Sequence, residues 1–408
     1  MLPAVTADAA RERTIFLVAG EHSGDALGAK LMAAVSASNC GPVRFAGVGG
    51  PLMDAQGMRS LFPLSDVAIM GIGAILAKLP HLYRRVWQTV DAAIAADPDV
   101  VVIIDSPEFT HPIARRLRRR RPDIAIIDYV SPSVWAWRSG RAPRMRAYVD
   151  HVLALLPFEP AEYVRLGGPP CTYVGHPLIE RLDWIATLEP APLAQRLALS
   201  TTSPVLVVLP GSRRSEVERL VGVFGATIER LMQHGVTPQV IVPTIGHLRD
   251  LVAERVRAWP VVPHLVSDET DKWRAFKLAR AALAASGTVA LELGLAGTPM
   301  VVGYKVDAVL AFVVRRMATA TTIILPNLIL ERHVFREFVQ EDCTPDTLAS
   351  ALRDVMADGP TRTAQLAALA ELPGRMAISE GTPSEAAARI VMREADQGAQ
   401  KRAAVGVV

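Results

Sequence analysis

Cysteine, aromatic residues and long apolar runs are all scarce in this chain of 408 residues. Its three cysteines, Cys40, Cys171 and Cys343, are scattered without CxxC spacing. This predicts reduced thiols in a cytoplasmic protein, with no disulfide framework and no zinc site. No apolar run reaches about 18 residues, and the N-terminus lacks a basic segment followed by an apolar one. We therefore expect no spanning helix and no signal peptide, so any membrane contact would be peripheral.

Several cofactor motifs are also missing. There is no GxxxxGK[ST] loop and no GxGxxG after a strand. GVGG at residues 47–50 resembles the second motif only weakly. No HExxH, His/Cys cluster or DxD pair marks a metal site. A bound nucleotide would therefore be neither NAD nor a hydrolysed ATP, and we expect no metal and no other cofactor.

The composition that remains is typical of packed α/β material. Half of the residues are hydrophobic and 21% are charged, which excludes a disordered chain and predicts two to three domains. The net charge of +3 is too small to imply a nucleic-acid partner. Arginines concentrate in RRLRRRR at 115–121. This run is either a solvated helix end or a patch that faces an anionic membrane or substrate.

Short apolar runs that end in turns alternate with helical segments along most of the chain. A stretch rich in Pro, Ser and Thr at 188–204 separates two similar halves. The pattern predicts an α/β protein with two doubly wound, Rossmann-like domains facing a cleft. We place the domains at 1–190 and 200–375. Residues 376–408 would form a C-terminal helix, capped by Thr382, and a tail that could pack back on the first domain.

Residues 281–304 read as a strand, a Ser-Gly-Thr turn, a helix and the next strand. Ser286, Gly287 and Thr288 would then lie where free N–H groups and the helix dipole favour an anion. Glu292 follows one helical turn later on the same face, where its carboxylate could accept hydrogen bonds from ribose hydroxyls. The alternative is an ordinary turn with a solvated glutamate.

A second strand, turn and helix occupies residues 209–220. Its turn contains Gly211 and Ser212, and two arginines follow. Arg213 or Arg214 could clamp a diphosphate, because guanidinium is a rigid fork of donors.

Asp105 ends a predicted buried strand. At the carboxyl end of a parallel strand it would point into the cleft, where a general base is useful. The alternative is an aspartate that caps the following helix.

The connection DYVSPSVWAWR, at 128–138, holds two tryptophans beside arginines. Trp135, Trp137 and Arg138 favour a sugar- or lipid-binding surface over simple core packing.

Residues 67–90 form an unusual apolar segment with Pro80 inside it. It is either a core helix broken by the proline or an amphipathic surface that dips into lipid headgroups. The basic and aromatic residues near its end are Tyr83, Arg84, Arg85 and Trp87.

A set of motifs spread over most of the chain resembles the lipid-A-disaccharide synthase family. In chain order these are GEHSGD, FAGVGG, IDSPEF, YVSPSVWAWR, LPFE, YVGHPL, LPGSR, SGTVALE, VVGYK and LPNL. The match departs in two places: His22 stands where Ala or Pro is usual, and Phe335-Arg336 precedes Glu337 where Leu or Val and then Pro is usual. The second departure bears on how the segment from Glu337 to Gln340 is positioned.

The resemblance implies an inverting GT-B glycosyltransferase. It would move a 2,3-diacylglucosamine unit from UDP to the 6-hydroxyl of 2,3-diacylglucosamine 1-phosphate, giving lipid A disaccharide 1-phosphate and UDP. Asp105 would be the base, and Arg213 would stabilise the departing diphosphate. The implied donor contacts, in the second domain, are Ser286, Gly287, Thr288, Glu292, Asn327, Gly211 and Ser212. The implied acceptor contacts are Ser23, Gly24, Asp25, Ser131, Trp135, Trp137, Arg138, His176, Glu337 and Gln340.

The family also implies a peripheral place on the inner face of the cytoplasmic membrane of a Gram-negative bacterium. Arg84, Arg85 and the run at 115–121 would contact the anionic surface. The first domain would face the membrane and take the acceptor, a homodimer is left open, and no nucleic acid is expected. The alternatives are a UDP-sugar 2-epimerase, an undecaprenyl-linked N-acetylglucosaminyltransferase and a non-catalytic membrane binder.

Overall fold

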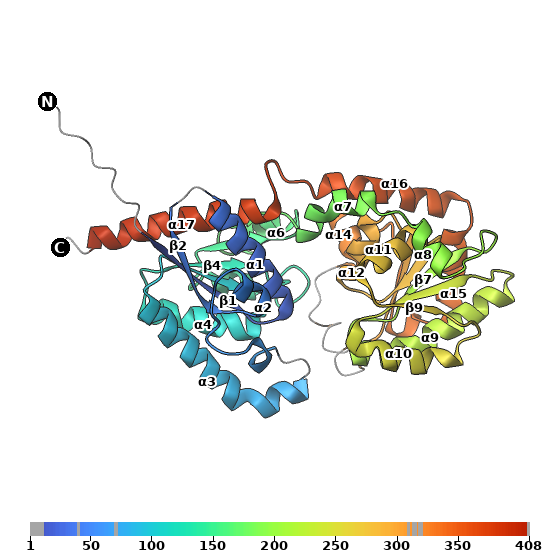
Figure 1. Ribbon diagram of the computed structural model, residues 1–408, viewed down its shortest axis with the longest axis horizontal. Coiled ribbons are helices and arrows are strands. Elements are labelled where there is room, and N and C mark those ends of the chain that lie inside the picture. The colour runs from blue at the N-terminus through green and yellow to red at the C-terminus, as the bar shows by residue number, and fades with distance from the viewer. Residues whose placement is uncertain are drawn as a thin grey trace. The chain divides into compact units, whose positions relative to one another are not determined.

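The computed structural model divides into two compact units (Figure 1). The first is Met1–Pro177 with Ile378–Val408, and the second is Leu178–Ala377. Residues 178–190 thus group with the second unit, not with the first half of the chain. The structure describes residues 12–405 apart from 39–40, 69–71, 308–310, 312–315 and 317–320, and it describes only the backbone of 72–78 and 399–405. Part of the segment 67–90 therefore lies outside the described residues.

The first unit is built on a parallel sheet. Its described strands are β1 (Arg13–Ala19), β2 (Val43–Val48), β3 (Val100–Ile104), β4 (Ala125–Tyr129), β5 (His151–Ala154) and β6 (Cys171–Tyr173). Their order is β2-β1-β3-β4-β5-β6, so the sheet grows to one side of β1 and then to the other. The helices are α1 (His22–Ala37), α2 (Pro51–Ala55), α3 (Ile72–Ala96), α4 (Pro107–Arg120), α5 (Arg141–Met145), α6 (Glu159–Arg165) and α17 (Pro383–Val405), with a 3-10 turn at Leu64–Asp66.

Strand β1 shows why both faces of this sheet are covered. Ile15 and Leu17 alternate with Phe16 and Val18, and all four side chains are buried. The first pair belongs to a core shared with α1 and α17, and the second pair to a core shared with α3 and α4. A strand buried on both faces needs a continuous apolar run, which is what the sequence supplies.

The C-terminal helix α17 belongs to the first unit. Thr382 caps it as expected: the N–H of Glu385 donates to Thr382 Oγ1 at 3.3 Å, and the N–H of Thr382 donates to Glu385 Oε2 at 2.8 Å. The helix packs against α1, β3 and β4. Arg13 Nε on β1 donates to Asp396 Oδ1 at 2.7 Å. The tail of the chain thus completes one face of the first sheet.

The second unit repeats the plan. Its described strands are β7 (Val205–Leu209), β8 (Gln239–Pro243), β9 (His264–Val266), β10 (Ala281–Ala284), β11 (Met300–Tyr304) and β12 (Glu337–Val339), in the order β12-β11-β10-β7-β8-β9. The helices are α7 (Leu182–Thr187), α8 (Ala191–Arg196), α9 (Arg214–Gln233), α10 (Arg249–Arg255), α11 (Glu269–Leu278), α12 (Thr288–Leu295), α14 (Leu325–Leu330), α15 (Pro345–Met356) and α16 (Pro360–Arg375). Single 3-10 turns lie at Pro177–Arg181, Gly246–Leu248, Val256–Ala258 and Gln340–Asp342.

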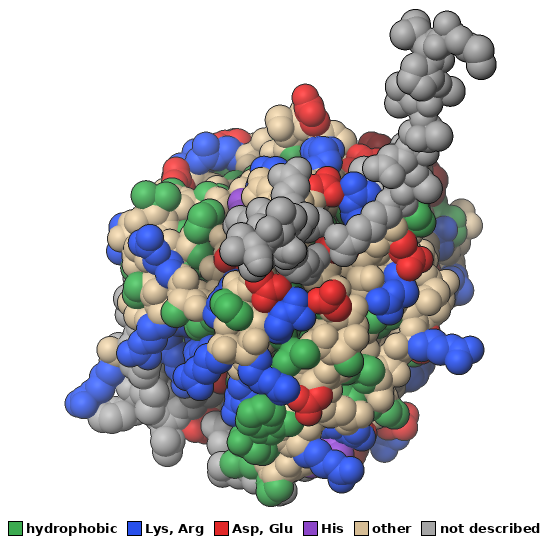
Figure 2. Space-filling view, turned by 90° about the vertical axis from the view of Figure 1, so that its left-hand side faces the viewer, with side chains coloured by type: hydrophobic (Ala, Val, Ile, Leu, Met, Phe, Trp, Pro, Cys, Tyr) green, Lys and Arg blue, Asp and Glu red, His purple; other side chains and the backbone are tan. Residues whose placement is uncertain are grey.

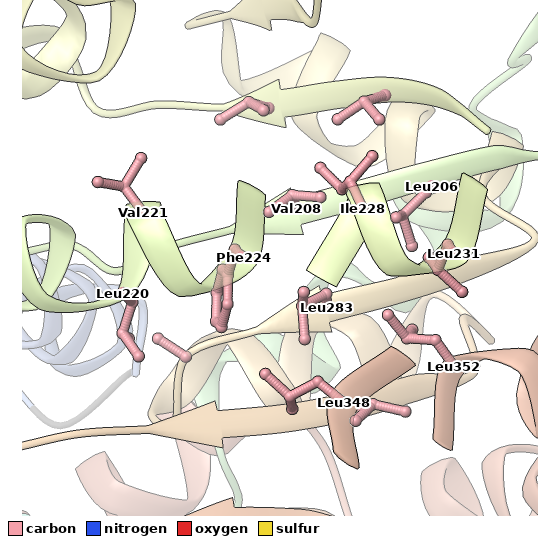
Figure 3. Packing of buried hydrophobic residues seen from close by; sticks show 14 of the residues in the cluster. Leu206, Val208, Leu220, Val221, Phe224, Ile228, Leu231, Leu283, Leu348 and Leu352 are labelled. Carbon is pink, nitrogen blue, oxygen red and sulfur yellow. The ribbon is translucent and has the colours of Figure 1, made fainter. Parts of the chain in front are cut away.

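Helix α9 anchors the core of the second unit. Phe224 and Ile228 point from it onto the sheet, next to Val208 of β7 (Figure 3). Leu348 and Leu352 of α15, which packs beside α9, complete the cluster. These side chains are completely buried. The packing fixes the start of α9 against the end of β7. Two parallel sheets with flanking helices confirm the predicted α/β class with two Rossmann-like domains.

Candidate active site

Each sheet has a switch point, and the predicted turns lie at both. The first sheet reverses between β1 and β3, which are followed by the turn at 20–25 and by Asp105. The second reverses between β7 and β10, which are followed by the turns at 210–213 and 286–288. Ligands of doubly wound sheets bind beyond the carboxyl ends of the strands at such points. The topology therefore places these turns where each unit is expected to bind a ligand.

Asp105 follows β3 directly and is half-buried. Ser23 Oγ donates to Asp105 Oδ2 at 3.4 Å, and the N–H of Ser106 donates to Asp105 Oδ1 at 2.7 Å. The backbone of Asp105 is fixed as well: its carbonyl accepts from Thr110 Oγ1 at 2.8 Å, and its N–H donates to the carbonyl of Tyr129 at 3.0 Å. The structure thus brings Ser23 and Asp105 together from separate motifs.

Backbone strain gathers beyond β3 and β4. Asp105, Ser106, Val130 and Arg138 have φ values of 54°, 46°, 86° and 53°. This left-handed region costs a residue other than glycine about 1–2 kcal/mol, and a β-branched residue such as valine rarely adopts it. Strain of this kind persists where the surrounding structure imposes it, and it clusters at functional sites.

Gly24 and Asp25 have structural roles. A Cβ at position 24 would lie 3.2 Å from a carbonyl oxygen of β3. Asp25 is 2% exposed, and its carboxylate accepts hydrogen bonds from the N–H groups of Gly50, Leu52 and Met53 at 2.8, 3.1 and 3.0 Å. It caps the start of α2. The contact between Asp25 and the acceptor stays a prediction, and in this structure its carboxylate already accepts three hydrogen bonds inside the fold.

Ser131 and Trp135 also turn inward. Ser131 Oγ donates to the Tyr163 hydroxyl at 3.2 Å, and Trp135 Nε1 donates to Glu159 Oε1 at 3.1 Å. The Trp135 ring packs edge-on against Phe158, with 5.3 Å between ring centres. Glu159 is 3% exposed, and burial raises its pKa to about 7. The polar atoms of Ser131 and Trp135 thus hold this connection in place instead of facing a ligand.

Trp137 and Arg138 form the outward part of the same connection. The guanidinium of Arg138 lies 4.3 Å from the centre of the Trp137 ring. Arg138 Nη1 and Arg141 Nη2 donate to Glu108 Oε1 at 3.3 and 2.7 Å. Burial alone would raise the pKa of Glu108, but the hydrogen bond from Arg141 and the arginine charges outweigh it and lower the pKa. The half-buried Trp137 ring and the exposed Arg138 could contact a sugar phosphate.

His176 follows β6 at the end of the first unit and is half-buried. Burial, with a smaller contribution from the charge of Lys30, lowers its pKa to about 4. The imidazole is therefore neutral at pH 7.

In the second unit, the Ser-Gly-Thr turn begins α12. Gly287 is exposed, with a φ of 147° and nothing within 4 Å of where a Cβ would be. Among the described residues, no side chain accepts a hydrogen bond from the first N–H groups of α12. Ser286 Oγ donates to the carbonyl of Ile323 at 2.9 Å. The turn therefore presents unoccupied backbone donors at a helix N-terminus, as an anion site requires.

Glu292 lies one turn further along α12. Lys272 Nζ of α11 donates to both of its carboxylate oxygens at 3.1 Å. Burial raises the pKa of Glu292, and Lys272 works against that rise. The carboxylate that is predicted to contact the ribose is therefore already hydrogen-bonded to Lys272.

The turn after β7 differs from the turn after β10. Glu216 Oε2 accepts hydrogen bonds from the N–H groups of Ser212 and Arg213 at 3.0 and 3.3 Å. Arg213 Nη1 and the Tyr304 hydroxyl donate to Glu216 Oε1 at 3.1 and 3.2 Å. Gly211 permits this, since a Cβ there would lie 2.4 Å from Glu216 Cβ. The phosphate contact through the Gly211-Ser212 backbone stays a prediction, and in this structure Glu216 already accepts from the N–H groups of Ser212 and Arg213.

Asn327 is 2% exposed and closes a loop. Its Oδ1 accepts hydrogen bonds from the N–H groups of Val334 and Phe335, both at 3.0 Å, and its Nδ2 donates to the carbonyl of Phe335 at 2.9 Å. The phosphate contact of Asn327 stays a prediction, and in this structure its amide shapes the loop.

Glu337 and Gln340 also hold backbone. Glu337 Oε2 accepts from Thr322 Oγ1 at 2.8 Å and from the N–H of Ile323 at 2.9 Å. Gln340 Oε1 accepts from the N–H of Val306 at 3.0 Å. Because Ile323 also contacts Ser286, Glu337 supports the segment beside the Ser-Gly-Thr turn. These predicted acceptor contacts thus lie in the second unit and act on its loops.

Three residues at the switch points were not predicted: Thr110, Glu216 and Lys272. The sequence did carry a signal for Glu216, which stands three residues after Arg213, the spacing of a capping box. Thr110 stands five residues after Asp105 and bonds back to its carbonyl within the same junction. Lys272 reaches Glu292 from 20 residues away, and no local pattern marks that pair.

Helix α3 exposes an aromatic stripe. Leu79, Tyr83 and Trp87 recur every four residues, which puts them on one face, and they are 48%, 56% and 36% exposed. The guanidinium of Arg116 lies 5.3 Å from both ring centres. Figure 2 looks onto the first unit and shows hydrophobic side chains interleaved with Lys and Arg toward the side where α3 lies in Figure 1.

Three of the six arginines in the run at 115–121 form ion pairs with aspartates. Arg118 pairs with Asp150, Arg120 with Asp91, and Arg121 with both Asp97 and Asp123. This run fits the solvated helix end better than a free basic patch. In the described part of the chain, no helix has the length and apolar character of a membrane span, and no cluster of His, Cys, Asp and Glu is placed to hold a metal ion.

Known proteins match the chain over most of its length. The family model for lipid-A-disaccharide synthetase matches residues 15–378. A lipid-A-disaccharide synthase of Rhodopseudomonas palustris (strain HaA2) is 53% identical over 93% of this chain and 96% of its own length. Those of Nitrobacter hamburgensis and Ruegeria pomeroyi are 52% and 44% identical, over 93% and 92% of this chain and 95% and 93% of their own lengths.

Solved structures share the fold at low sequence identity. A UDP-GlcNAc 2-epimerase from Neisseria meningitidis, bound to UDP-GlcNAc, has a TM-score of 0.64 at 12% identity, over 93% of this chain and 100% of that one. MurG of Acinetobacter baumannii has a TM-score of 0.55 at 12% identity, over 93% and 99%. These similarities support the fold alone. The family model and the close relatives show that the chain belongs to the lipid-A-disaccharide synthase family.

Proposed function

We propose that this protein transfers a 2,3-diacylglucosamine unit from UDP to the 6-hydroxyl of 2,3-diacylglucosamine 1-phosphate, with inversion at the sugar carbon. Membership of the family supports the reaction class. The observation that carries the mechanism is Asp105: a half-buried carboxylate in a strained backbone, at a switch point, with a hydroxyl donor beside it.

In the proposed step, Asp105 accepts the proton of the acceptor's 6-hydroxyl. The hydroxyl oxygen bonds to the anomeric carbon from the face opposite the diphosphate, and the bond from that carbon to the phosphate oxygen breaks. The electron pair leaves with UDP. Attack from the opposite face gives the β-linked product, and a positioned base is worth about 10²–10⁴-fold in rate.

On the donor side, the open N-terminus of α12 holds the diphosphate, and Glu292 accepts hydrogen bonds from the ribose. Arg213 stabilises the charge that develops on the leaving diphosphate. Its side chain is 59% exposed, so the guanidinium can reach a ligand from where it lies. Fixed donors aimed at developing charge are commonly the largest single contribution to catalysis.

The aromatic stripe of α3 is the proposed membrane contact. Leu79, Tyr83 and Trp87 would enter the headgroup region while exposed Arg84 meets lipid phosphates, on the inner face of the cytoplasmic membrane. Replacing Tyr83 and Trp87 by serine should reduce sedimentation with vesicles that contain phosphatidylglycerol. Unchanged sedimentation would remove the stripe from the proposal.

The direct test is product analysis by mass spectrometry, with synthetic UDP-diacylglucosamine and diacylglucosamine 1-phosphate. Formation of the disaccharide phosphate together with UDP supports the proposal. A 2-epimerase would release an epimer of the sugar without any acceptor, and an undecaprenyl-dependent transferase would need the polyprenyl acceptor. Either of those outcomes, without disaccharide, would contradict it.

A further inference from the structure

We propose that Glu216 is a positioning residue for Arg213, and that Tyr304 fixes Glu216 in turn. The inference rests on the proposed function and deepens its donor side. It assigns a role to the buried carboxylate at the start of α9, which is 6% exposed and makes four hydrogen bonds.

The geometry divides the two oxygens of Glu216 between two tasks. Oε2 meets the N–H groups of Ser212 and Arg213 and so satisfies the start of α9. Oε1 meets Arg213 Nη1 and the Tyr304 hydroxyl, neither of which a helix cap requires. A simple capping residue would need only the first oxygen. The second oxygen therefore holds the guanidinium of Arg213 at a buried carboxylate whose position is fixed.

Tyr304 makes this point rigid. It ends β11, two strands from β7 in the sheet, and its hydroxyl reaches across to Glu216. Burial raises the pKa of Tyr304, and the neighbouring carboxylate adds to that rise, so its hydroxyl keeps its proton at neutral pH. Glu216 is thus held by groups at the ends of two strands, β7 and β11. Its hydrogen bond to Arg213 therefore fixes the position of that guanidinium.

A fixed guanidinium matters because Arg213 acts on developing charge. A long, exposed side chain left free would spend much of its time away from the leaving oxygen, and about 1 Å of misplacement can lower a rate up to 100-fold. The same carboxylate fills the backbone donors of α9, so the diphosphate has no anion site there. Arg213 is left to contribute through its side chain alone.

The test is a double-mutant cycle with Glu216→Gln, Tyr304→Phe and Arg213→Lys, read out as kcat, KM for the UDP-sugar and Kd for UDP. Glu216→Gln keeps the shape but removes the charge, and we expect kcat to fall on the order of tenfold or more. Kd for UDP should change little. In the Arg213→Lys background the same replacement should have almost no effect, since it acts through the arginine.

Glu218→Gln is the matched control, because Glu218 pairs with Arg214 at 2.9 Å on the same helix in an exposed position. It should leave kcat unchanged. If Glu216→Gln does not fold, Tyr304→Phe replaces it in the same cycle with Arg213→Lys, and a smaller fall in kcat is expected. An unchanged kcat, an equal fall in the Arg213→Lys background, or a strong gain in UDP affinity would each overturn the inference. Disaccharide formation by the unaltered enzyme is scored separately and tests the proposed function.

Discussion

The two strand–turn–helix junctions at the switch point of the second sheet resemble each other in sequence, but different groups meet their helix N–H donors. At the start of α12, the Ser-Gly-Thr turn is exposed and Gly287 is open to approach. At the start of α9, the side chain of Glu216 already fills the donors of Ser212 and Arg213. The same local fold thus gives one turn with open N–H donors, where we propose an anion site, and one turn whose donors Glu216 already fills.

The difference assigns different work to the two turns. The α12 turn offers backbone donors that bind substrate and product alike, so it should set the affinity for UDP. The α9 turn offers only the Arg213 side chain, fixed by Glu216, so it should act where charge builds up during the reaction. Substitutions at the start of α12 should therefore change Kd for UDP, and substitutions of Arg213 should change kcat.

The largest expected effect lies outside both turns. Replacing Asp105 by asparagine keeps the size of the side chain but removes the base, and kcat should fall by about 10²–10⁴-fold. UDP binding, measured by titration calorimetry, should stay close to that of the unaltered protein. Weaker UDP binding would show that donor affinity does not belong to the second unit alone, and a normal kcat would remove Asp105 as the base.

Arg213→Ala should come next, with a loss of about 3–4 kcal/mol of transition-state stabilisation, the scale of a lost oxyanion donor. The measurement is kcat under saturating substrates, with Kd for UDP as the second readout. Arg214→Ala is the control, since Arg214 pairs with Glu218 on the surface. If Arg214→Ala lowers kcat and Arg213→Ala does not, Arg214 is the residue that stabilises the leaving diphosphate.

Gly287→Ala tests the open turn and should weaken UDP binding about tenfold, the scale of one lost hydrogen bond to a charged group. Gly297→Ala, at the other end of α12, is the matched control, because Gly297 has a φ of 74° and nothing lies within 4 Å of where its Cβ would be. It should lower the stability of the protein but leave the affinity for UDP unchanged. Gly211→Ala should instead lower the melting temperature, because its Cβ would collide with Glu216. Equal Kd values for Gly287→Ala and Gly297→Ala would refute an anion site at this turn.

The smallest effect concerns pH. Burial raises the pKa of Glu292, so its carboxylate takes up a proton at a higher pH than an ordinary glutamate does. As the pH falls through this raised pKa, the carboxylate proposed to accept from the ribose is lost. UDP binding should then weaken by a few-fold more in the unaltered protein than in Glu292→Gln. The variant provides the reference for protonation of the phosphate itself. Parallel pH profiles would show that Glu292 does not touch the ribose.

The fold and the positions of the turns could be predicted because they depend on local patterns. Apolar runs that end in Gly, Ser or Asp gave the strands, and alternation with helices gave the parallel sheets. Asp105 and the Ser-Gly-Thr turn followed from the rule that ligands bind beyond the carboxyl ends of strands. These features survive because each depends on residues adjacent in the chain.

Some side chains that were predicted to contact a ligand make hydrogen bonds inside the protein, with partners that the local sequence does not indicate. Asp25 was expected at the acceptor, but it caps α2, which begins 26 residues later in the chain. Asn327 was expected at the phosphate, and its buried amide closes the loop that runs to Phe335. A buried polar group must find a partner, and the sequence does not reveal whether that partner is a ligand or the protein's own backbone.

A crystal structure of the complex with UDP would test the division between the two turns most directly. We expect the diphosphate against the N–H groups of Gly287 and Thr288, with Glu216 still bound to the N–H groups of Ser212 and Arg213 and the guanidinium directed at the phosphates. A diphosphate seated on the N–H groups of Ser212 and Arg213, with Glu216 displaced, would contradict it.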